Sequence, residues 1–365
     1  MADIYSKRRE KLRRLMKKQG VDVLLVTNFT NVTWLTGFTG DDSYVLVSSE
    51  DECILSDSRY TIQIGEECPG LRLLLRGGKT GFAPLIHDEL EKISSSPRLA
   101  VESNSVTLDT AERFKSALGV ELIPVSGLVE TLRQVKDREE IQTIRDSARI
   151  ARNAFHAIRA LLTPDWTEKQ IADELEFAMR RLGARDASFP TIAAVGPRAA
   201  LPHCVPGEHR VSEAGSLLID WGAKFKGYAS DLTRVLITGR VSAEYRKVYQ
   251  IVLDAQRKAI EAIQPGKKCS QIDQVARDYI AQAGYGECFG HGLGHGIGLY
   301  IHEGPSFSPG CDIILKPGMV ITVEPGIYVK NWGGVRIEDD VLVTRDGFEV
   351  LSDVEKEFDE MKVFG

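Results

Sequence analysis

Residues 216–239 read SLLIDWGAKFKGYASDLTRVLITG. Two strand-like runs flank Ala-Lys-Phe-Lys-Gly, a composition typical of a hairpin turn. If the turn is centred near Phe225 and Lys226, Asp220 and Asp231 lie opposite each other on neighbouring strands. Two carboxylates that face each other across a hairpin repel and destabilise it unless a cation compensates them. This segment therefore predicts a β-hairpin that presents two acids to a cation.

A second hairpin repeats this design in residues 319–343, which read MVITVEPGIYVKNWGGVRIEDDVLV. A turn centred near Asn331 brings Glu324 opposite Glu338. The acids of both hairpins lie in apolar strand contexts, LLID, VITVE and VRIE, where an unpaired charge is costly to bury. One aspartate in a strand is usually a pairing or edge device, so the prediction rests on the whole set.

A glycine-rich stretch between the hairpins, residues 289–305, reads FGHGLGHGIGLYIHEGP. Glycines around its histidines let the backbone approach a ligand closely. Four carboxylates and one imidazole balance the charge of two divalent cations, and oxygen-rich ligation suits Mn²⁺ or a similar metal. A water between two such cations is deprotonated near neutral pH and becomes a nucleophile. We therefore predict a two-metal hydrolytic site with five ligands: Asp220, Asp231, His295, Glu324 and Glu338.

Other motifs do not support a different chemistry. Gly78-Lys79-Thr80 resembles the end of a phosphate-binding loop, but Leu73 occupies the position of its first glycine. The sequence contains no Gly-x-Ser-x-Gly elbow and no His-Glu-x-x-His helix. Isolated histidines are more often surface or core residues than ligands, so we assign no role to His87, His156 or His209.

Composition sets the broad class of the protein. The 365 residues are 43% hydrophobic and 27% charged, which is typical of a globular chain long enough for two domains. The net charge of -6 argues against a general nucleic-acid partner. No apolar run reaches 18 residues, so we expect no membrane association. Six scattered cysteines without a Cys-x-x-Cys pair indicate reduced thiols and a cytoplasmic location.

The domain boundary falls where the pattern changes, and we place the domains at residues 1–132 and 133–365. The first part alternates helical patterns with six β-rich runs, which predicts an α/β domain with a mixed sheet. A long helical pattern starts at Asp137, and Thr167-Glu-Lys-Gln170 predicts a capping box on the next helix. Pro-Gly at 265–266 echoes Pro-Asp at 164–165, which hints at a duplicated helix–helix–strand unit in an α+β domain.

The motifs resemble a known family over nearly the whole chain. DWGAKFKGYASDLTR, GHGLGHGIGLYIHEGP, VITVEPGIYV and GVRIED resemble the pita-bread metallopeptidases, specifically the Xaa-Pro aminopeptidase and prolidase branch. NVTWLTGFTG and LSDSRY resemble the creatinase-type amino-terminal domain of that branch. The resemblance implies an α/β creatinase-type domain followed by an α+β pita-bread catalytic domain.

The resemblance also implies roles for the ligands. Asp220 would chelate one metal, Asp231 and Glu338 would bridge both, and His295 and Glu324 would complete the shell of the other. Glu324 is also the family's candidate proton shuttle between nucleophile and leaving amine. The expected cofactors are two divalent ions, with Mn²⁺ preferred and Co²⁺ or Zn²⁺ as alternatives.

Further residues match positions around the reacting carbonyl of this family. His203, His291 and His302 would contact substrate and stabilise the tetrahedral intermediate, although His203 alone is equally typical of a loop. Tyr328 and Arg336 match substrate-orienting positions, and Arg336 can equally hold the carboxylate of Glu338.

The branch usually forms homodimers in which a neighbouring subunit closes the pocket. On that basis Trp34 and Phe38 are candidates for the closing residues, with ordinary core packing as the alternative.

The leading functional hypothesis is an Xaa-Pro aminopeptidase, a metal-dependent enzyme that hydrolyses the bond between an amino-terminal residue and a following proline in proline-containing peptides. The alternative is an Xaa-Pro dipeptidase (prolidase), which uses the same chemistry in a pocket with no room beyond the proline. More distant alternatives are a metal-free creatinase-like hydrolase and a non-enzymatic peptide-binding module. A methionine aminopeptidase does not need the first domain.

Overall fold

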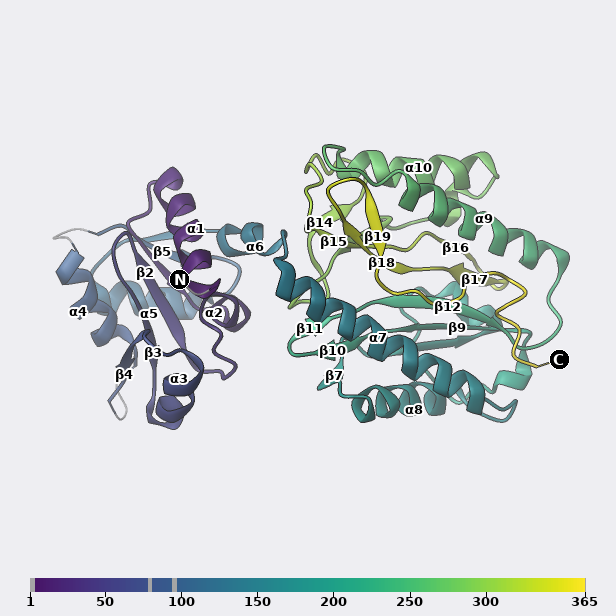
Figure 1. Ribbon diagram of the computed structural model, residues 1–365, viewed down its shortest axis with the longest axis horizontal. Helices are drawn as coiled ribbons and strands as arrows, with labels where there is room; N and C mark the ends of the chain where they lie inside the picture. The colour runs from purple at the N-terminus through teal and green to yellow at the C-terminus, as the bar shows by residue number, and fades with distance from the viewer. Residues whose placement is uncertain (1–3, 78–80, 94–96, 365) are drawn as a thin grey trace. The chain divides into compact units, whose positions relative to one another are not determined.

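The computed structural model describes residues 4–77, 81–93 and 97–364 (Figure 1). The chain divides into two compact units, Met1–Arg133 and Gln134–Gly365. This boundary lies one residue after the one that the sequence analysis placed between residues 132 and 133. The rejected phosphate-loop segment at 78–80 lies outside the described residues.

The first unit is built on a six-stranded mixed sheet with the order β4-β3-β2-β1-β5-β6. Strand β1 pairs antiparallel with β2 and parallel with β5. All six β-rich runs form strands, so the predicted α/β unit with a mixed sheet is confirmed. Their bounds are β1 (Val23–Val26), β2 (Tyr44–Ser48), β3 (Glu52–Ser56), β4 (Arg72–Leu75), β5 (Leu99–Glu102) and β6 (Leu122–Val125).

Helices cover both faces of this sheet. Side chains alternate along a strand, so Val23 and Leu25 of β1 share one face, where they join a core with Ile86 of α4 and Phe114 of α5. Helices α1 and α2 contact strands β1 and β2. The helices of the unit are α1 (Ile4–Gln19), α2 (Phe29–Thr36), α3 (Thr61–Glu67), α4 (Ala83–Ile93), α5 (Leu108–Leu118) and α6 (Leu128–Arg133).

Two aromatic residues of the first unit correct a sequence-based prediction. Trp34 and Phe38 are only 4% and 0% exposed, so they cannot reach a neighbouring subunit. The Arg8 guanidinium lies 4.6 Å from the Trp34 ring centre, and Phe38 packs edge-on against Tyr60. Gly37 caps the carboxyl end of helix α2 in the left-handed conformation, with a φ of 85°. The chain turns there, and Phe38 enters the core. The alternative, ordinary core packing, is what the structure shows.

The second unit opens with two capped helices. Asp137 and Glu140 form a capping box that starts α7 (Arg138–Leu161). Thr167 and Gln170 form the predicted capping box at the start of α8 (Glu168–Arg181). Each box satisfies backbone N–H groups that the first helical turn leaves without partners. Both helix starts therefore agree with the sequence.

A second helix pair, α9 (Ala243–Glu261) and α10 (Cys269–Gln282), repeats this arrangement. The residue before α8, Thr167, bridges Arg210, and the residue before α10, Lys268, bridges Ile314 in the same antiparallel sense. The three-stranded sheet β8-β9-β12 follows the first pair, and the five-stranded sheet β14-β13-β15-β18-β19 follows the second. In Figure 1 the two helix pairs lie on opposite sides of these strands. The predicted duplication is therefore present in the fold.

The strands of this unit form several short sheets. Their bounds are β7 (Asp186–Ala187), β8 (Ile192–Val195), β9 (Ser216–Trp221), β10 (Ala223–Phe225), β11 (Tyr228–Ala229), β12 (Leu232–Ile237), β13 (Gly294–Gly296), β14 (Glu303–Phe307), β15 (Val320–Val323), β16 (Gly326–Val329), β17 (Gly333–Arg336), β18 (Asp339–Val343) and β19 (Phe348–Val350).

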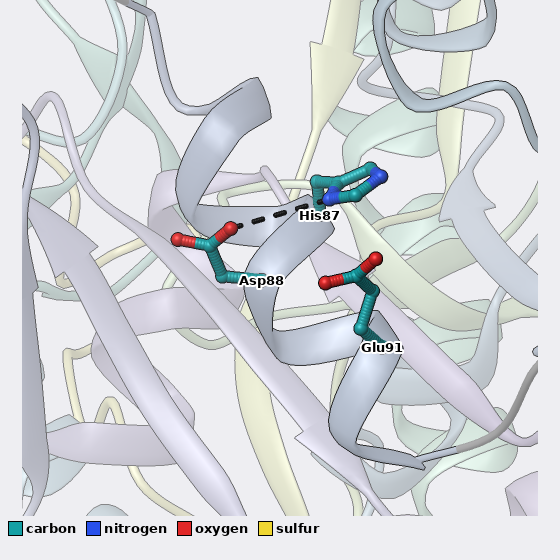
Figure 2. Close-up of side chains that lie close together, drawn as sticks. All are labelled: His87, Asp88 and Glu91. Carbon is teal, nitrogen blue, oxygen red and sulfur yellow. Dashed lines mark ion pairs between the residues drawn. The ribbon is translucent and has the colours of Figure 1, made fainter.

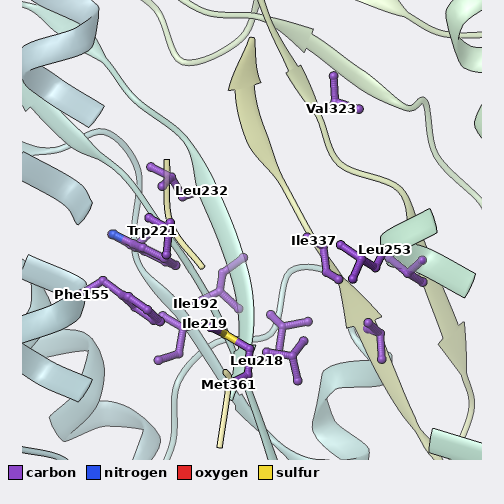
Figure 3. Packing of buried hydrophobic residues seen from close by; sticks show 14 of the residues in the cluster. Phe155, Ile192, Leu218, Ile219, Trp221, Leu232, Leu253, Val323, Ile337 and Met361 are labelled. Carbon is purple, nitrogen blue, oxygen red and sulfur yellow. The ribbon is translucent and has the colours of Figure 1, made fainter. Parts of the chain in front are cut away.

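One apolar core joins both halves of the second unit (Figure 3). Phe155 of α7 stacks on Trp221 of β9 at 4.5 Å between ring centres, while Ile337 of the second half lies near Leu253 of α9. Because strand side chains alternate, Trp221 and its neighbour Ile219 face α7. Asp220, between them, must point the opposite way, toward the space enclosed by the two halves.

Candidate active site

The first hairpin differs from its predicted register. Leu232 pairs with Trp221 and Thr233 with Asp220, so Asp231 lies diagonally from Asp220 rather than opposite it. The turn is centred one position later than predicted, on Lys226 and Gly227, whose φ angles of 48° and 86° suit a two-residue hairpin loop. Asp220 therefore pairs with Thr233, two residues beyond its predicted partner Asp231. Because side chains repeat every two residues, both acids still point to one face.

The second hairpin has the predicted register. The pairings of β15 with β18 and of β16 with β17 follow one continuous register, which places Glu324 opposite Glu338. Asn331 lies in the turn with a φ of 61°. The two hairpins meet where the Glu338 N–H donates to the carbonyl oxygen of Thr233 at 3.1 Å. This contact brings the acids of one hairpin beside those of the other.

Four of the predicted ligands converge on one point. Asp231, His295 and Glu338 each offer a ligand atom within 4.8 Å of the others. The His295 Nε2 atom lies 3.5 Å from Asp231 Oδ2 and 3.4 Å from Glu324 Oε1. The structure therefore gathers an imidazole and three carboxylates that are far apart in the sequence.

Asp220, the fifth predicted ligand, enters the same cavity from β9. Its Oδ2 atom accepts a hydrogen bond from Arg336 Nη2 at 2.5 Å. Its Oδ1 atom is buried and has no hydrogen-bond partner among the described residues. A buried carboxylate oxygen without a donor is unfavourable by itself, and a bound cation would satisfy it.

The electrostatics of the cluster oppose ionisation in the absence of a cation. Burial raises the pKa of Asp231 and of Glu338 well above their usual values, and the neighbouring carboxylates raise both further. Burial also raises the pKa of Glu324 to about 8. Burial lowers the pKa of His295 to about 4, which keeps its imidazole neutral and able to bind a metal.

The donor set fits divalent cations. Among the described residues that line the cavity, Arg336 is the one lysine or arginine, against four carboxylates. Oxygen donors with one neutral imidazole are ligands that Mn²⁺-like ions accept. The unpartnered oxygen of Asp220 and the excess of carboxylates over cationic side chains therefore both indicate a binding site for divalent cations.

The cluster lies in a cavity of about 780 Å³. The lining includes every residue predicted to act on substrate: His203, His291, His302, Tyr328 and Arg336. Apolar side chains that the sequence analysis missed, including Phe189, Ile192 and Ile301, complete the wall. Such residues carry no motif of their own, because an apolar residue in a cavity wall resembles one in a core.

A hydrogen-bond network links these side chains. The Tyr328 hydroxyl lies 3.0 Å from His291 Nε2 and accepts from Arg336 Nη1 at 2.9 Å. Burial lowers the pKa of His291 to about 4 and raises that of Tyr328 to about 12, so both are neutral near pH 7. Arg336 thus holds Asp220 directly, whereas the sequence left open whether it serves Glu338 or the substrate.

Two threonines hold site carboxylates and were also missed. Thr233 Oγ1 donates to Glu338 Oε2 at 2.6 Å and accepts from Arg336 Nε at 3.1 Å. Thr322 Oγ1 donates to Glu324 Oε1 at 3.2 Å. Each threonine lies two residues from a predicted ligand in the sequence, so strand periodicity was the available signal.

The histidines without an assigned role lie elsewhere. His87, Asp88 and Glu91 come together on the exposed surface of α4, with His87 Nδ1 4.0 Å from Asp88 Oδ1 (Figure 2). His156 and His209 make partly exposed contacts with glutamates at 3.6 and 2.8 Å. Solvent screens such groups, so they provide little reason to hold an ion.

Profiles of two known domain families match the chain in sequence. Residues 8–135 match the Creatinase/Prolidase N-terminal domain, and residues 142–345 match Metallopeptidase family M24. The chain belongs to metallopeptidase family M24. Membership makes it a peptidase that depends on divalent metal ions, with a creatinase-type domain followed by a pita-bread catalytic domain, as its sequence motifs imply.

Known M24 proteins resemble this peptidase over almost its full length. The structure of an Xaa-Pro dipeptidase from Bacillus anthracis has a TM-score of 0.94 and 38% identity, covering 97% of this chain and 99% of that one. An X-Pro aminopeptidase from Thermotoga maritima MSB8 has a TM-score of 0.86 and 36% identity, covering 95% and 99%. The Xaa-Pro dipeptidase of Pyrococcus furiosus is 34% identical, covering 96% and 99%. Within the described part of this M24 peptidase, no helix combines the length and apolarity that a membrane crossing requires.

Proposed function

We propose that this M24 peptidase is an Xaa-Pro dipeptidase, which cleaves the bond between an amino-terminal residue and a carboxy-terminal proline. The observation that carries the proposal is the cluster of four carboxylates, three of them buried, and one neutral imidazole in a single cavity. Two of the three relatives described above are named Xaa-Pro dipeptidases, which favours this activity over the aminopeptidase predicted first.

Two divalent ions would be held by the five predicted ligands. The ligands would be Asp220, Asp231, His295, Glu324 and Glu338, whose side chains all line the cavity. We propose Mn²⁺ as the native metal, with Co²⁺ and Zn²⁺ as alternatives, because the donor set is rich in oxygen. When bound, the ions would supply Lewis-acid activation of water near neutral pH.

The chain's own residues account for the proton and charge movements. Glu324 lines the cavity beside the other ligands and would take a proton from the attacking water and pass it to the leaving nitrogen of proline. His203 and His302 line the cavity and can donate hydrogen bonds to the oxygen of the reacting carbonyl. His291 also lines the cavity, but its Nδ1–H donates to the carbonyl oxygen of Gly292 at 2.7 Å, so its Nε2 accepts from the Tyr328 hydroxyl and holds that residue in place. Arg336 would keep Asp220 and Tyr328 in place during the reaction.

Proline explains why such a cavity is needed. The Xaa-Pro bond is a tertiary amide without an N–H, so a protease that grips an extended backbone has no donor to bind. A compact cavity holds the substrate by its ends and ring instead. The apolar wall suits the methylenes of a pyrrolidine ring, and the ligand side of the cavity would hold the free amino terminus near the metals.

Substrate length separates the proposal from its nearest rival. A panel would pair each Xaa-Pro dipeptide with Xaa-Pro peptides of three to six residues, with and without Mn²⁺. A dipeptidase cleaves the first and leaves the others intact. Equal or faster cleavage of the longer peptides would establish an Xaa-Pro aminopeptidase, the second candidate, which the Thermotoga maritima relative supports.

Two controls address the remaining alternatives. Activity that survives exhaustive chelation would favour a metal-free creatinase-like hydrolase. A chain that binds no divalent ion and cleaves nothing would be a peptide-binding module. We also propose a cytoplasmic homodimer, which light scattering of the purified protein and fractionation of cells would test.

A further inference from the structure

An ion pair on α10, outside the cavity lining, contacts the loop that carries His291. Asp273 and Arg277 lie one helical turn apart. Asp273 is fully buried, and its two oxygens each accept a hydrogen bond from the Arg277 guanidinium at 2.8 Å. Two parallel bonds of this kind fix the plane of the guanidinium. The remaining donors of Arg277 are therefore aimed in one direction.

Those donors reach alternate residues of the loop 289–293. Arg277 Nη1 donates to the carbonyl oxygen of Phe289 at 3.2 Å, and Nη2 donates to that of His291 at 2.8 Å. The guanidinium also lies 4.4 Å from the centre of the Phe289 ring. Asp273 Oδ1 accepts from the Leu293 N–H at 3.0 Å. One ion pair thus binds three backbone groups of five consecutive residues.

The same loop touches the site at two places. The imidazole of His291 meets the Tyr328 hydroxyl inside the cavity. The carbonyl oxygen of Leu293 accepts a hydrogen bond from the Glu324 N–H at 2.8 Å. A displacement of this loop would therefore move a substrate-facing imidazole and a predicted ligand together.

The composition of the loop explains why it needs an external restraint. Gly290 and Gly292 flank His291, and a glycine backbone has more freedom to lose on folding than any other. A Cβ at Gly292 would meet the carbonyl oxygen of Phe307 at 2.9 Å, so a stiffer residue cannot replace it. The rigidity that the loop cannot supply has to come from a neighbour.

We infer that Asp273 and Arg277 are a positioning pair, which sets the places of His291 and Glu324 for peptide cleavage. Neither residue lines the cavity. The inference rests on the proposed function for the roles of His291 and Glu324, whereas the restraint on the loop stands independently of it. A purely structural role would stabilise α10 without affecting the reaction.

The test compares Arg277→Met with three other variants of the full-length metal-loaded protein. Arg277→Lys keeps the charge but loses the fork of donors. Lys169→Met removes an ion pair of the same spacing with Asp173 on α8, the corresponding helix of the first half. Ile280→Val weakens the core packing of α10 and leaves the hydrogen bonds of the ion pair in place.

We expect Arg277→Met to lower kcat on an Xaa-Pro dipeptide about 10- to 100-fold at unchanged metal content, because small misplacements of catalytic groups are this costly. Arg277→Lys should recover part of the loss, and Lys169→Met and Ile280→Val should stay within about twofold of wild type. Amide exchange in peptides covering 289–293 and Glu324 should accelerate about tenfold in Arg277→Met, and less in Arg277→Lys.

Unchanged exchange in both Arg277 variants would overturn the restraint itself. Unchanged kcat with accelerated exchange, or a loss of kcat equal to that of Ile280→Val, would overturn the positioning role. If Arg277→Met fails to fold, Arg277→Lys decides by the same two measurements. If wild type cleaves no Xaa-Pro dipeptide, the proposed function fails, and the exchange data alone still decide whether the pair restrains the loop.

Discussion

Glu338 and Asp339 are neighbours in the sequence and are equally buried, each 1% exposed, yet their surroundings are opposite. Asp339 faces away from the cavity and accepts hydrogen bonds from four side chains at 2.6–2.7 Å: Arg234, Gln256, Ser352 and Lys356. Burial opposes its ionisation, but the two cations hold the pKa of Asp339 well below its usual value. Glu338 accepts a hydrogen bond from the hydroxyl of Thr233, and burial raises the pKa of Glu338.

The contrast shows what distinguishes a structural acid from a ligand. Burial of an acid is compatible with either role, because both carboxylates are out of water. The difference is whether the protein supplies the countercharge. Around Asp339 the chain provides its own cations, and at Glu338 and Asp231 it leaves the charge uncompensated. A site that leaves carboxylates uncompensated at this cost is built for an ion from outside.

The strongest prediction concerns the uncompensated side. Asp231→Asn should reduce the hydrolysis of Xaa-Pro dipeptides by about a thousandfold or more, since a neutral amide cannot replace the charged carboxylate of this proposed metal ligand. The volume hardly changes, so the circular dichroism spectrum should remain that of wild type. The metal-free variant should be at least as stable as metal-free wild type, because a neutral amide replaces a buried carboxyl group whose ionisation is opposed by burial and by its neighbours. Turnover within tenfold of wild type at saturating Mn²⁺ would contradict the claim that Asp231 is a metal ligand and Asp339 a structural acid.

The compensated side should respond in the opposite way. Asp339→Asn leaves the buried guanidinium of Arg234 without its carboxylate, and breaking a buried pair costs about 3–5 kcal/mol. Urea denaturation of the metal-free proteins measures this loss directly. A free energy of unfolding equal to that of wild type, or an equal loss in Asp231→Asn, would show that the two acids do not differ as described.

The contrast also predicts how stability depends on pH in the metal-free protein. Glu324 has a pKa of about 8 in the fold against 4.5 without it, so between pH 6.5 and 8 the folded chain binds more protons than the unfolded one. The free energy of unfolding should therefore fall as pH rises through this window, by about 2 kcal/mol for one such group. His291 and His295, with pKa values lowered to about 4 from 6.5, give the opposite slope, which is strongest below pH 6.5 and offsets part of the fall up to about pH 7.5.

Urea titrations at pH 6.5, 7.0, 7.5 and 8.0 would measure this slope with chelator and with Mn²⁺. Bound metal displaces the protons, so the loaded protein should not lose stability as the pH rises. A metal-free protein whose stability rises over the same window would contradict the raised pKa values.

A smaller effect is expected at the residue that joins the two hairpins. Thr233→Val keeps the shape of the side chain but removes the donor to Glu338 and the acceptor for Arg336. Loss of such a supporting hydrogen bond typically lowers metal affinity or activity at least about tenfold. Metal titration and kcat on one dipeptide would measure both quantities. The matched variant Thr238→Val, on a hydroxyl bonded to the carbonyl of Ala214, should leave both unchanged.

Part of this organisation was readable from the sequence because strands repeat every two residues. The register of the second hairpin followed from a turn at Asn331, and the acids of both hairpins fell on one face. The first hairpin was misread by two residues because Lys226 and Gly227, not Phe225 and Lys226, take the positive φ angles of the turn. Because the register was wrong by two residues, and strand side chains repeat every two residues, both acids still pointed to the predicted face.

Other features depend on tertiary contacts that no local pattern encodes. The motif GVRIED does not reveal that its last residue, Asp339, meets Arg234 and Lys356, since these cations come from other segments. The restraint of the loop at 289–293 by Arg277 is equally invisible, because an aspartate and arginine four residues apart are common on any helix. Trp34 was misjudged because an aromatic residue has the same signature in a core and at an interface.

The most direct test of the uncompensated cluster is calorimetric titration of chelated protein with Mn²⁺ in buffers of different ionisation enthalpy. We expect two ions per chain to bind, with net release of protons, and Xaa-Pro hydrolysis to appear with the second ion. Asp231→Asn should not bind both. A wild-type chain that takes up no ion, or that binds ions without releasing protons, would contradict the account.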